Sequence, residues 1–192
     1  MPGNRPVTPA DNSAARVAVD RLCLHHRIEQ QAITRPDAIA VSCGEQQLSY
    51  SELDQRANRL ANTLLAAGVL PDTTVGLCLD RSVELVVGLL GILKAGGAYV
   101  PLDPAYPPDR LAHIVDQAAP QLIVSTAELA TGLSAASATI VDINSTTTAS
   151  NDRPTTNVGP DNLCYAQSEL LSDCRVQSEC PSGEDCIDGK CR

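Results

Sequence analysis

The stretch that decides the fold lies at Leu93–Leu111 and reads LKAGGAYVPLDPAYPPDRL. An apolar helical run ends at Gly96 and Gly97, because glycines reach the positive φ values that commonly end helices. Lys94 lies in the last turn, where a cation offsets the negative end of the helix dipole. The next residues, AYV, predict a short buried strand, and its pairing must stop or lie at a sheet edge at Pro101, since proline has no backbone N–H. The segment therefore predicts a helix, a strand and a rigid proline-rich corner in succession.

Strand and helix patterns alternate on both sides of this corner. Such alternation predicts a parallel sheet with right-handed crossovers. We therefore predict the α/β fold class, with a largely parallel sheet flanked by helices and a hairpin near its start. The helices are expected at 22–31, 51–68, 82–94, 109–118 and 127–133, and the strands at 38–42, 47–50, 74–79, 98–100, 121–125 and 139–143.

Two of these helices begin with capping residues. Ser51–Asp54, SELD, predicts a capping box, and Ser82 predicts an N-cap. The helix that follows Ser82 is apolar nearly all round. A helix without a polar face must be covered on most of its sides, so we expect it in the core.

The composition indicates a globular protein that does not bind nucleic acid. The chain has 192 residues, 43% of them hydrophobic, and its core must use Leu, Val, Ile and Ala because Phe and Trp are lacking. Its 14 Lys and Arg against 23 Asp and Glu give a net charge of −9. A protein that binds the phosphate backbone needs a basic surface, so we expect no nucleic-acid partner.

No segment of the sequence predicts secretion or membrane insertion. The first 20 residues lack the apolar core of a signal peptide. The longest apolar segment, Val83–Leu93, is too short to span a bilayer and contains Glu84. We expect no membrane partner and a cytoplasmic location.

Composition divides the chain into four parts. Residues 1–21 are polar and predict a disordered arm, whereas 22–143 carry the α/β pattern. Residues 144–163 are polar and rich in Thr, which predicts a linker. Residues 164–192 hold five of the eight cysteines and predict a small irregular tail.

The histidines do not predict a metal site. His25 and His26 lack a third ligand at a plausible spacing, so a solvated helix face is the favoured interpretation. His113 is interpreted as a solvated or neutral side chain. The cysteines before the tail are interpreted as small core residues: Cys23, Cys43 and Cys78.

Two long segments resemble a known enzyme family. LSYSELDQRANRLANTLLAAGV at Leu48–Val69 resembles the first core motif of the amino-acid adenylation domains of nonribosomal peptide synthetases, and Leu93–Leu111 resembles the second. RPDAIAV at Arg35–Val41 and VGLCLDRSVELVVGLLGILKAGG at Val75–Gly97 fit the same family. The likeness covers Leu22–Tyr165, so the chain is similar to the N-terminal portion of such a domain.

The resemblance implies membership of the AMP-binding, adenylate-forming ligases. It implies that a full-length relative condenses an amino acid with ATP, with Mg²⁺ as cofactor, releases pyrophosphate, and passes the acyl group to a phosphopantetheine thiol of a carrier domain. The implied partners are the remainder of an adenylation domain or a carrier domain. The two motifs are chiefly structural in the family, so we assign no catalytic, cofactor-binding or metal-binding residue.

The sequence departs from the family after Gly159–Tyr165. GPDNLCY resembles the lead into the family's third motif, a Ser/Thr/Gly-rich loop that ends in a lysine and embraces the ATP phosphates with its backbone N–H groups. Here Tyr165 is followed by AQSELLSDCRVQ, and the chain's two lysines are Lys94 and Lys190. We therefore predict that this chain alone binds no ATP and does not adenylate amino acids.

The tail resembles the short cysteine-rich repeats of many secreted proteins. Four of its cysteines could form two disulfides in any of three pairings. A zinc knot is less favoured, because the tail has no C-x2-C pair and no histidine, and an accidental reading frame is the third interpretation. Disulfides fit poorly with a cytosolic enzyme, which favours a truncated or fused gene product. The four cysteines are Cys174, Cys180, Cys186 and Cys191.

Three functional classes stay open from the sequence. The favoured one is an N-terminal fragment of an adenylation domain that is inactive alone. The others are a cysteine-rich interaction module on an α/β scaffold and a non-functional gene remnant. Because the strands that would complete the family's sheets are missing, we expect an exposed apolar patch or open sheet edge, with marginal stability or self-association.

Overall fold

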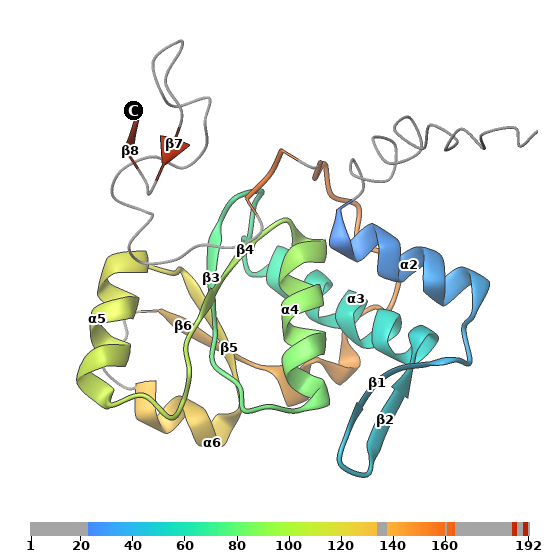
Figure 1. The fold of residues 1–192 in the computed structure, drawn as a ribbon, viewed down its shortest axis with the longest axis horizontal. Helices are drawn as coiled ribbons and strands as arrows, with labels where there is room; N and C mark the ends of the chain where they lie inside the picture. The colour runs from blue at the N-terminus through green and yellow to red at the C-terminus, as the bar shows by residue number, and fades with distance from the viewer. Residues whose placement is uncertain (1–22, 134–137, 160, 164–185, 188–189, 192) are drawn as a thin grey trace, which may run out of the picture.

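Figure 1 shows the fold of the chain in a computed structural model. The arm expected at 1–21 and most of the tail expected at 164–192 lie outside the residues that the structure describes. The described residues are 23–133, 138–159, 161–163, 186–187 and 190–191.

The centre of the fold is a four-stranded sheet (Figure 1). Its strands are β3 (Thr74–Leu77), β4 (Ala98–Pro101), β5 (Leu122–Ser125) and β6 (Thr139–Asp142). They lie in the order β4-β3-β5-β6, and every neighbouring pair is parallel. The predicted α/β class with a parallel sheet is confirmed. The strand that ends in Pro101 lies at an edge of this sheet, where a missing N–H costs no ladder hydrogen bond.

Helices flank the sheet, and an antiparallel hairpin lies beside them. The helices are α2 (Leu24–Thr34), α3 (Tyr50–Ala66), α4 (Val83–Ala95), α5 (Pro108–Ala118) and α6 (Ala127–Ala130), with 3-10 turns η1 (Thr131–Leu133) and η2 (Ile143–Thr148). The hairpin strands are β1 (Ile39–Cys43) and β2 (Gln46–Ser49). Every helix and strand expected between residues 22 and 143 is therefore present, with ends shifted by a few residues.

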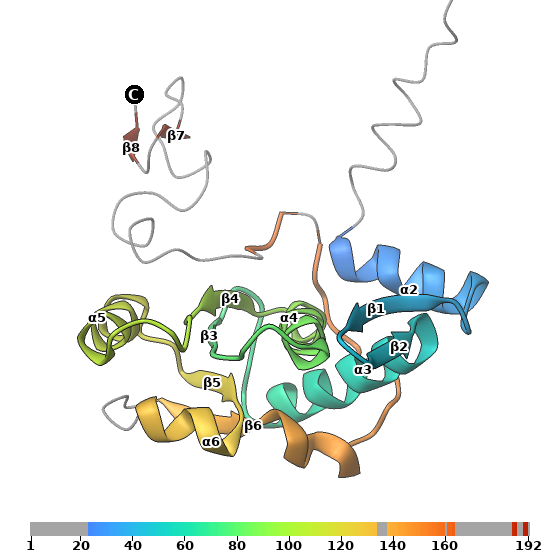
Figure 2. The same ribbon diagram turned by 60° about the horizontal axis from the view of Figure 1, so that its bottom comes forward.

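The sheet separates two apolar cores. The ribbon views show α3 and α4 on one side of it and α5 on the other (Figures 1 and 2). Successive side chains of a strand point to opposite faces. In β5, Leu122 and Val124 therefore join the core formed with α3 and α4, whereas Ile123 joins the core formed with α5. All four residues of β5 are buried, as expected for a central strand of a parallel sheet.

Both ends of α4 follow from its sequence, with one correction. The Ser82 hydroxyl accepts a hydrogen bond from the Leu85 N–H, so the predicted N-cap is confirmed. Gly96 ends the helix at φ 89°, in the left-handed region that favours glycine. The positive φ expected at Gly97 is wrong; a Cβ there would lie 3.2 Å from the Thr73 carbonyl oxygen, so this glycine permits a close approach of backbone.

The N-cap of α3 differs from the prediction. The cap is Ser49, two residues before the expected Ser51. The Ser49 hydroxyl accepts from the Glu52 N–H, and the Glu52 carboxylate accepts from the Ser49 N–H at 2.8 Å. This is the S-x-x-E spacing of a capping box, which the sequence presents at 49–52 and not at 51–54.

Helices α3 and α4 pack closely because α4 carries small residues at their contact. A Cβ on Gly91 would lie 2.6 Å from Leu60 Cδ2, so glycine is needed for this approach. Outside the apolar contact, Arg56 of α3 and Glu84 of α4 form an ion pair of 2.9 Å. The core position expected for α4 is confirmed, since most of its residues are buried.

The stretch expected as a linker, 144–163, contacts the α/β core where the structure describes it. The Asn58 side-chain amide donates to the carbonyl of Asn151 at 3.0 Å. The Thr156 hydroxyl donates to the carbonyl of Lys94 at 3.2 Å. These bonds hold the stretch against α3 and the C-terminal end of α4.

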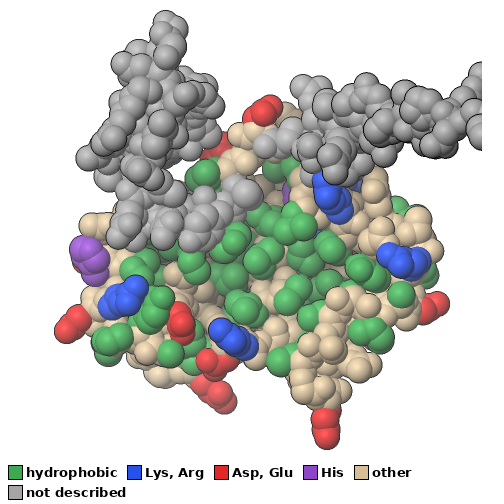
Figure 3. Space-filling view, viewed as in Figure 1, with side chains coloured by type: hydrophobic (Ala, Val, Ile, Leu, Met, Phe, Trp, Pro, Cys, Tyr) green, Lys and Arg blue, Asp and Glu red, His purple; other side chains and the backbone are tan. Residues whose placement is uncertain are grey.

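Apolar side chains gather over α4 and β4 on the face shown in Figure 3. An open hollow of about 720 Å³ lies there, lined by apolar residues that include Leu85, Leu89, Tyr99 and Leu102. Charged residues such as Arg81 border it. Over the described part of the chain, no helix combines the length and the hydropathy that crossing a bilayer requires.

Candidate functional site

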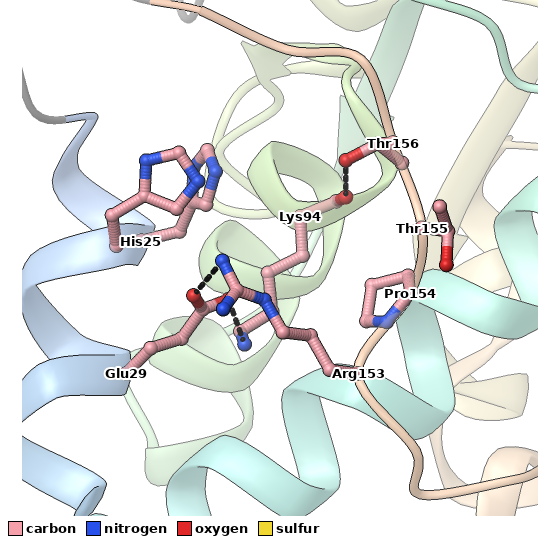
Figure 4. A pocket seen from close by; sticks show the side chains of 8 residues that line it. His25, Glu29, Lys94, Arg153, Pro154, Thr155 and Thr156 are labelled. Atoms are coloured by element: carbon pink, nitrogen blue, oxygen red, sulfur yellow. Dashed lines mark hydrogen bonds and ion pairs between the residues drawn. The ribbon is translucent and has the colours of Figure 1, made fainter.

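Side chains from α2 and α3 converge on the ammonium group of Lys94, which lies on α4. Figure 4 shows Lys94 with Glu29 of α2. The Lys94 Nζ donates to Glu29 Oε1 at 2.7 Å, to Asp54 Oδ1 at 2.8 Å and to Asn58 Oδ1 at 2.8 Å. Lys94 is only 1% exposed, so this cation lies inside the protein. A buried charge is tolerated when it is paired and hydrogen-bonded, and both conditions are met here.

Local sequence explains how the acceptors come together. Asp54 and Asn58 are one turn apart on α3, so their side chains share a face of that helix. Glu29 lies on α2, which packs beside α3, and Lys94 lies in the last turn of α4. The cluster therefore joins the three helices at one point.

The hydrogen bonds of Lys94 restrict its chemistry. A lysine ammonium has three N–H donors, and three acceptors already receive them. It therefore has no donor left for a phosphate. The sequence predicted only a cation near a helix end. In the structure, Lys94 also links α4 to α2 and α3 through buried hydrogen bonds.

Arg153 completes the charge balance. Its Nη2 lies 2.7 Å from Glu29 Oε2, so the Glu29 carboxylate bridges Lys94 and Arg153. The Arg153 side chain is 62% exposed, in contrast to that of Lys94. Two cations thus face the carboxylates of Glu29 and Asp54, and the four formal charges cancel.

A polar cavity of about 260 Å³ lies beside this cluster. In Figure 4 the chain from Arg153 to Thr156 passes on one side and α2, with His25 and Glu29, on the other. Lys94 and His26 also line it. It is therefore a gap between α2 and the stretch that follows η2.

His25 is not on a solvated face, so the sequence interpretation of the paired histidines is wrong for this residue. It is 4% exposed, and burial, reinforced by the neighbouring His26, lowers the pKa of His25 from 6.5 to about 4. The two imidazole centroids are 4.2 Å apart, with the rings tilted by 57°. Cys23 lies close by, with its Sγ and a ring nitrogen of each histidine all within 4.8 Å of one another. His113 is exposed, as expected.

Sequence reasoning missed Cys23 because it counted only histidines. The residue caps α2, so its side chain lies next to the first turn that carries both imidazoles. The C-x-H-H spacing was the signal that could have revealed this group. Of the other cysteines before the tail, Cys78 is buried as expected, whereas Cys43 is exposed and corrects the prediction of a core position.

The tail cysteines are only partly described. Cys174 and Cys180 lie outside the described residues. The backbones of Cys186 and Cys191 are opposite each other in the antiparallel pair β7 (Cys186–Ile187) and β8 (Lys190–Cys191). The disulfides of the tail stay a prediction.

Comparison with known proteins identifies the family of the chain. The AMP-binding enzyme family matches residues 28–183. The chain belongs to the AMP-binding enzyme family. Its parallel sheet and both core motifs lie within the matched residues, so the resemblance drawn from the sequence is confirmed.

The similar members include nonribosomal peptide synthetases. The dimodular nonribosomal peptide synthase of Bacillus subtilis (strain 168) is 50% identical over 112 residues, which are 58% of this chain and 5% of that protein. The AMB antimetabolite synthetase AmbB of Pseudomonas aeruginosa is 42% identical over 155 residues, which are 80% of this chain and 12% of that protein. The chain thus spans only a small part of the relatives it matches.

A solved nonribosomal peptide synthetase shares the fold. The crystal structure of FmoA3 (S1046A) in its alpha-methyl-L-serine-AMP bound form matches with a TM-score of 0.72 and 32% identity, over 79% of this chain and 19% of that one. The 192-residue chain therefore corresponds to the N-terminal portion of an adenylation domain.

Proposed function

We propose that the chain is the N-terminal structural part of an amino-acid-activating adenylation unit of nonribosomal peptide synthesis, and that it activates no amino acid by itself. In this function it contributes a packed α/β layer and a surface for the remainder of the unit. ATP with Mg²⁺ and a phosphopantetheine carrier are then ligands and partners of the whole unit. The proposal includes a cytoplasmic location.

The proposal is supported by where the lysines lie in the chain and by the hydrogen bonds of Lys94. A phosphate loop of the family ends in a lysine that contacts ATP, and the sequence after Tyr165 offers neither the Gly-rich loop nor that lysine. Lys94, the lysine whose side chain the structure describes, donates all its N–H groups to Glu29, Asp54 and Asn58. These residues therefore supply no group suited to grip a triphosphate.

The apolar hollow over α4 and β4 supports the structural role. Leu85 and Leu89 of α4 are half-buried and line it together with Tyr99 of the edge strand. Exposed apolar patches next to polar borders are typical of surfaces that another part of a protein covers. In the proposed unit, the remainder of the adenylation domain covers this hollow.

The test is complementation with a separately expressed remainder. The remainder is taken from the dimodular nonribosomal peptide synthase of Bacillus subtilis, as the part of its adenylation domain that follows the segment matching this chain. We expect no amino-acid-dependent ATP–pyrophosphate exchange with this chain alone, and a 1:1 complex with the remainder in size-exclusion chromatography. Exchange by the chain alone, or no complex at any concentration tested, would contradict the proposal. A matched variant, Leu89→Glu, should weaken the complex, whereas Leu70→Glu, at a side chain 66% exposed elsewhere, should not.

A further inference from the structure

One group of potential ligands lies outside the Lys94 cluster. Cys23, His25 and His26 stand at the start of α2, and one ligand atom from each lies within 4.8 Å of the other two. The charged residues that also line the cavity, Glu29, Lys94 and Arg153, take part in the ion pairs already described. The cysteine and the two histidines therefore form a separate group with the chemistry of metal ligands.

We propose that Cys23, His25 and His26 bind one divalent transition-metal ion of the zinc type, with a fourth ligand position open to the adjoining cavity. Thiolate and imidazole are the ligands that Zn²⁺ prefers, and three protein ligands with one open position are a recurrent arrangement. Hard cations such as Mg²⁺ prefer oxygen ligands, so the group is not a magnesium site.

The geometry of the three residues fits a tetrahedral ion after small rotations. With metal–nitrogen bonds of about 2.0–2.1 Å and a metal–sulfur bond of about 2.3 Å, tetrahedral ligand atoms lie about 3.3–3.6 Å apart. The observed group is already within 4.8 Å, and its imidazole centroids are 4.2 Å apart. Cys23 and His26 are half-buried whereas His25 is buried, so we assign the adjustment to Cys23 and His26.

Cys23 lies at the N-cap of α2, beside the first turn that carries both imidazoles. A thiolate is the form that binds a metal ion, and binding of the ion displaces the thiol proton.

The surroundings allow a cation and a fourth ligand. Lys94 and Arg153 are the cations next to the cavity, and the carboxylates of Glu29 and Asp54 already neutralise them. The cavity of about 260 Å³ is lined by both histidines and has room for a water or a small ligand on the ion. His25 is held in a buried position, which limits how far the ligand group can spread.

Metal titration of the full reduced chain tests the site. The chain is freed of metal with a chelator, and Zn²⁺ binding is measured by competition with a chromogenic chelator. Because the tail has five cysteines of its own, the readout is the difference between the wild type and matched variants. Cys23→Ser and His26→Asn should each lose one equivalent of Zn²⁺, or bind it at least about 10- to 100-fold more weakly, since even outer-shell changes have effects of that size.

Two controls separate this site from other cysteines and histidines. Cys43→Ser and His113→Asn change exposed residues elsewhere and should bind as the wild type does. With Co²⁺, the wild type should show a thiolate-to-metal charge-transfer band that decreases in Cys23→Ser. His25 is buried, so the Zn²⁺ binding of His25→Asn is compared with that of the wild type only if the circular dichroism spectra of the two proteins match.

Equal stoichiometry and affinity in the wild type, Cys23→Ser and His26→Asn would overturn the proposal. So would a loss in one of these two variants but not in the other, because the ion is assigned to all three residues. A rise in melting temperature with Zn²⁺ that both variants lack would support it independently.

Discussion

The ammonium group of Lys94, in the last turn of α4, lies 2.7 Å from the Glu29 carboxylate on α2. The two residues are 65 positions apart in the sequence. This contact, together with Asp54 and Asn58, joins α2, α3 and α4 at one buried point. Lys94 therefore has a structural role, and its ammonium group has no free donor with which to bind a nucleotide.

Removing this cation should destabilise the protein strongly. Lys94→Met leaves the Glu29 and Asp54 carboxylates without their buried partner, and breaking a buried pair costs about 3–5 kcal/mol. We expect urea unfolding at neutral pH to show a loss of this size. Arg153→Met is the matched control, because it removes a 62%-exposed partner from the same Glu29 carboxylate and should cost no more than about 1 kcal/mol. Equal losses of stability in Lys94→Met and Arg153→Met would show that burial does not determine how much each ion pair with Glu29 stabilises the protein.

A methyl group on Gly91 should separate α3 from α4. In Gly91→Ala the new Cβ would lie 2.6 Å from Leu60 Cδ2, and overpacking of this kind costs about 1–3 kcal/mol. In Gly132→Ala the Cβ has no atom within 4 Å, so thermal unfolding should show little change. If Gly91→Ala raised the melting temperature, the close packing of the two helices would be refuted.

Glu52 should make the stability depend on pH in the acid range. The hydrogen bond from the Ser49 backbone, followed by that from its hydroxyl, lowers the pKa of Glu52 below 4.5. The stabilisation that Glu52 contributes is therefore fully present at pH values above its pKa in the unfolded chain. It is lost as the pH falls through its lower pKa in the folded protein. The stability difference between the wild type and Glu52→Gln should shrink below pH 4.5. The stability of the control Glu45→Gln, at an exposed turn residue, should depend on pH as that of the wild type does. If the stability difference between the wild type and Glu52→Gln did not change with pH, the capping role of the Glu52 carboxylate would be contradicted.

The cysteines before the tail should react at different rates. Burial raises the pKa of the Cys78 thiol, and the thiolate is the reactive form. Cys43 is exposed. In a short iodoacetamide pulse followed by peptide mass spectrometry, Cys43 should be labelled well before Cys78. Faster labelling of Cys78 would place it at the surface.

The hollow over α4 should cause self-association of the chain alone. Sedimentation velocity should show a mass that rises with concentration, because association covers apolar area. Leu89→Glu should reduce this rise, whereas Leu70→Glu, away from the hollow, should leave it unchanged. A monomer at every concentration would count against an unpartnered surface.

Local patterns were sufficient for much of the fold. The alternation of strands and helices, the cap at Ser82 and the stop at Gly96 depend on a few neighbouring residues, and the structure confirms them. The α3 cap was misplaced by two residues because Ser49 and Ser51 both precede acidic residues at the same spacing. The glutamate of S-x-x-E at 49–52, in place of the aspartate at 51–54, was the local signal that distinguishes them.

The Lys94 cluster could not be predicted from such patterns. Its partners lie 36 to 65 residues away, and no local rule joins them. Two hints were present: a single lysine at the end of a helix whose other residues, apart from Glu84, are apolar, and a polar pair, Asp54 and Asn58, four residues apart beside apolar positions. Together they indicate a buried cation with acceptors on a neighbouring helix. The C-x-H-H group was missed for a simpler reason, since Cys23 was assigned to the core.

The proposed function implies that this chain by itself does not bind a nucleoside triphosphate. Equilibrium dialysis of the purified chain against labelled ATP and Mg²⁺ tests it most directly. The account predicts no saturable binding, both in the wild type and in Lys94→Met. Saturable binding of one ATP per chain would contradict it.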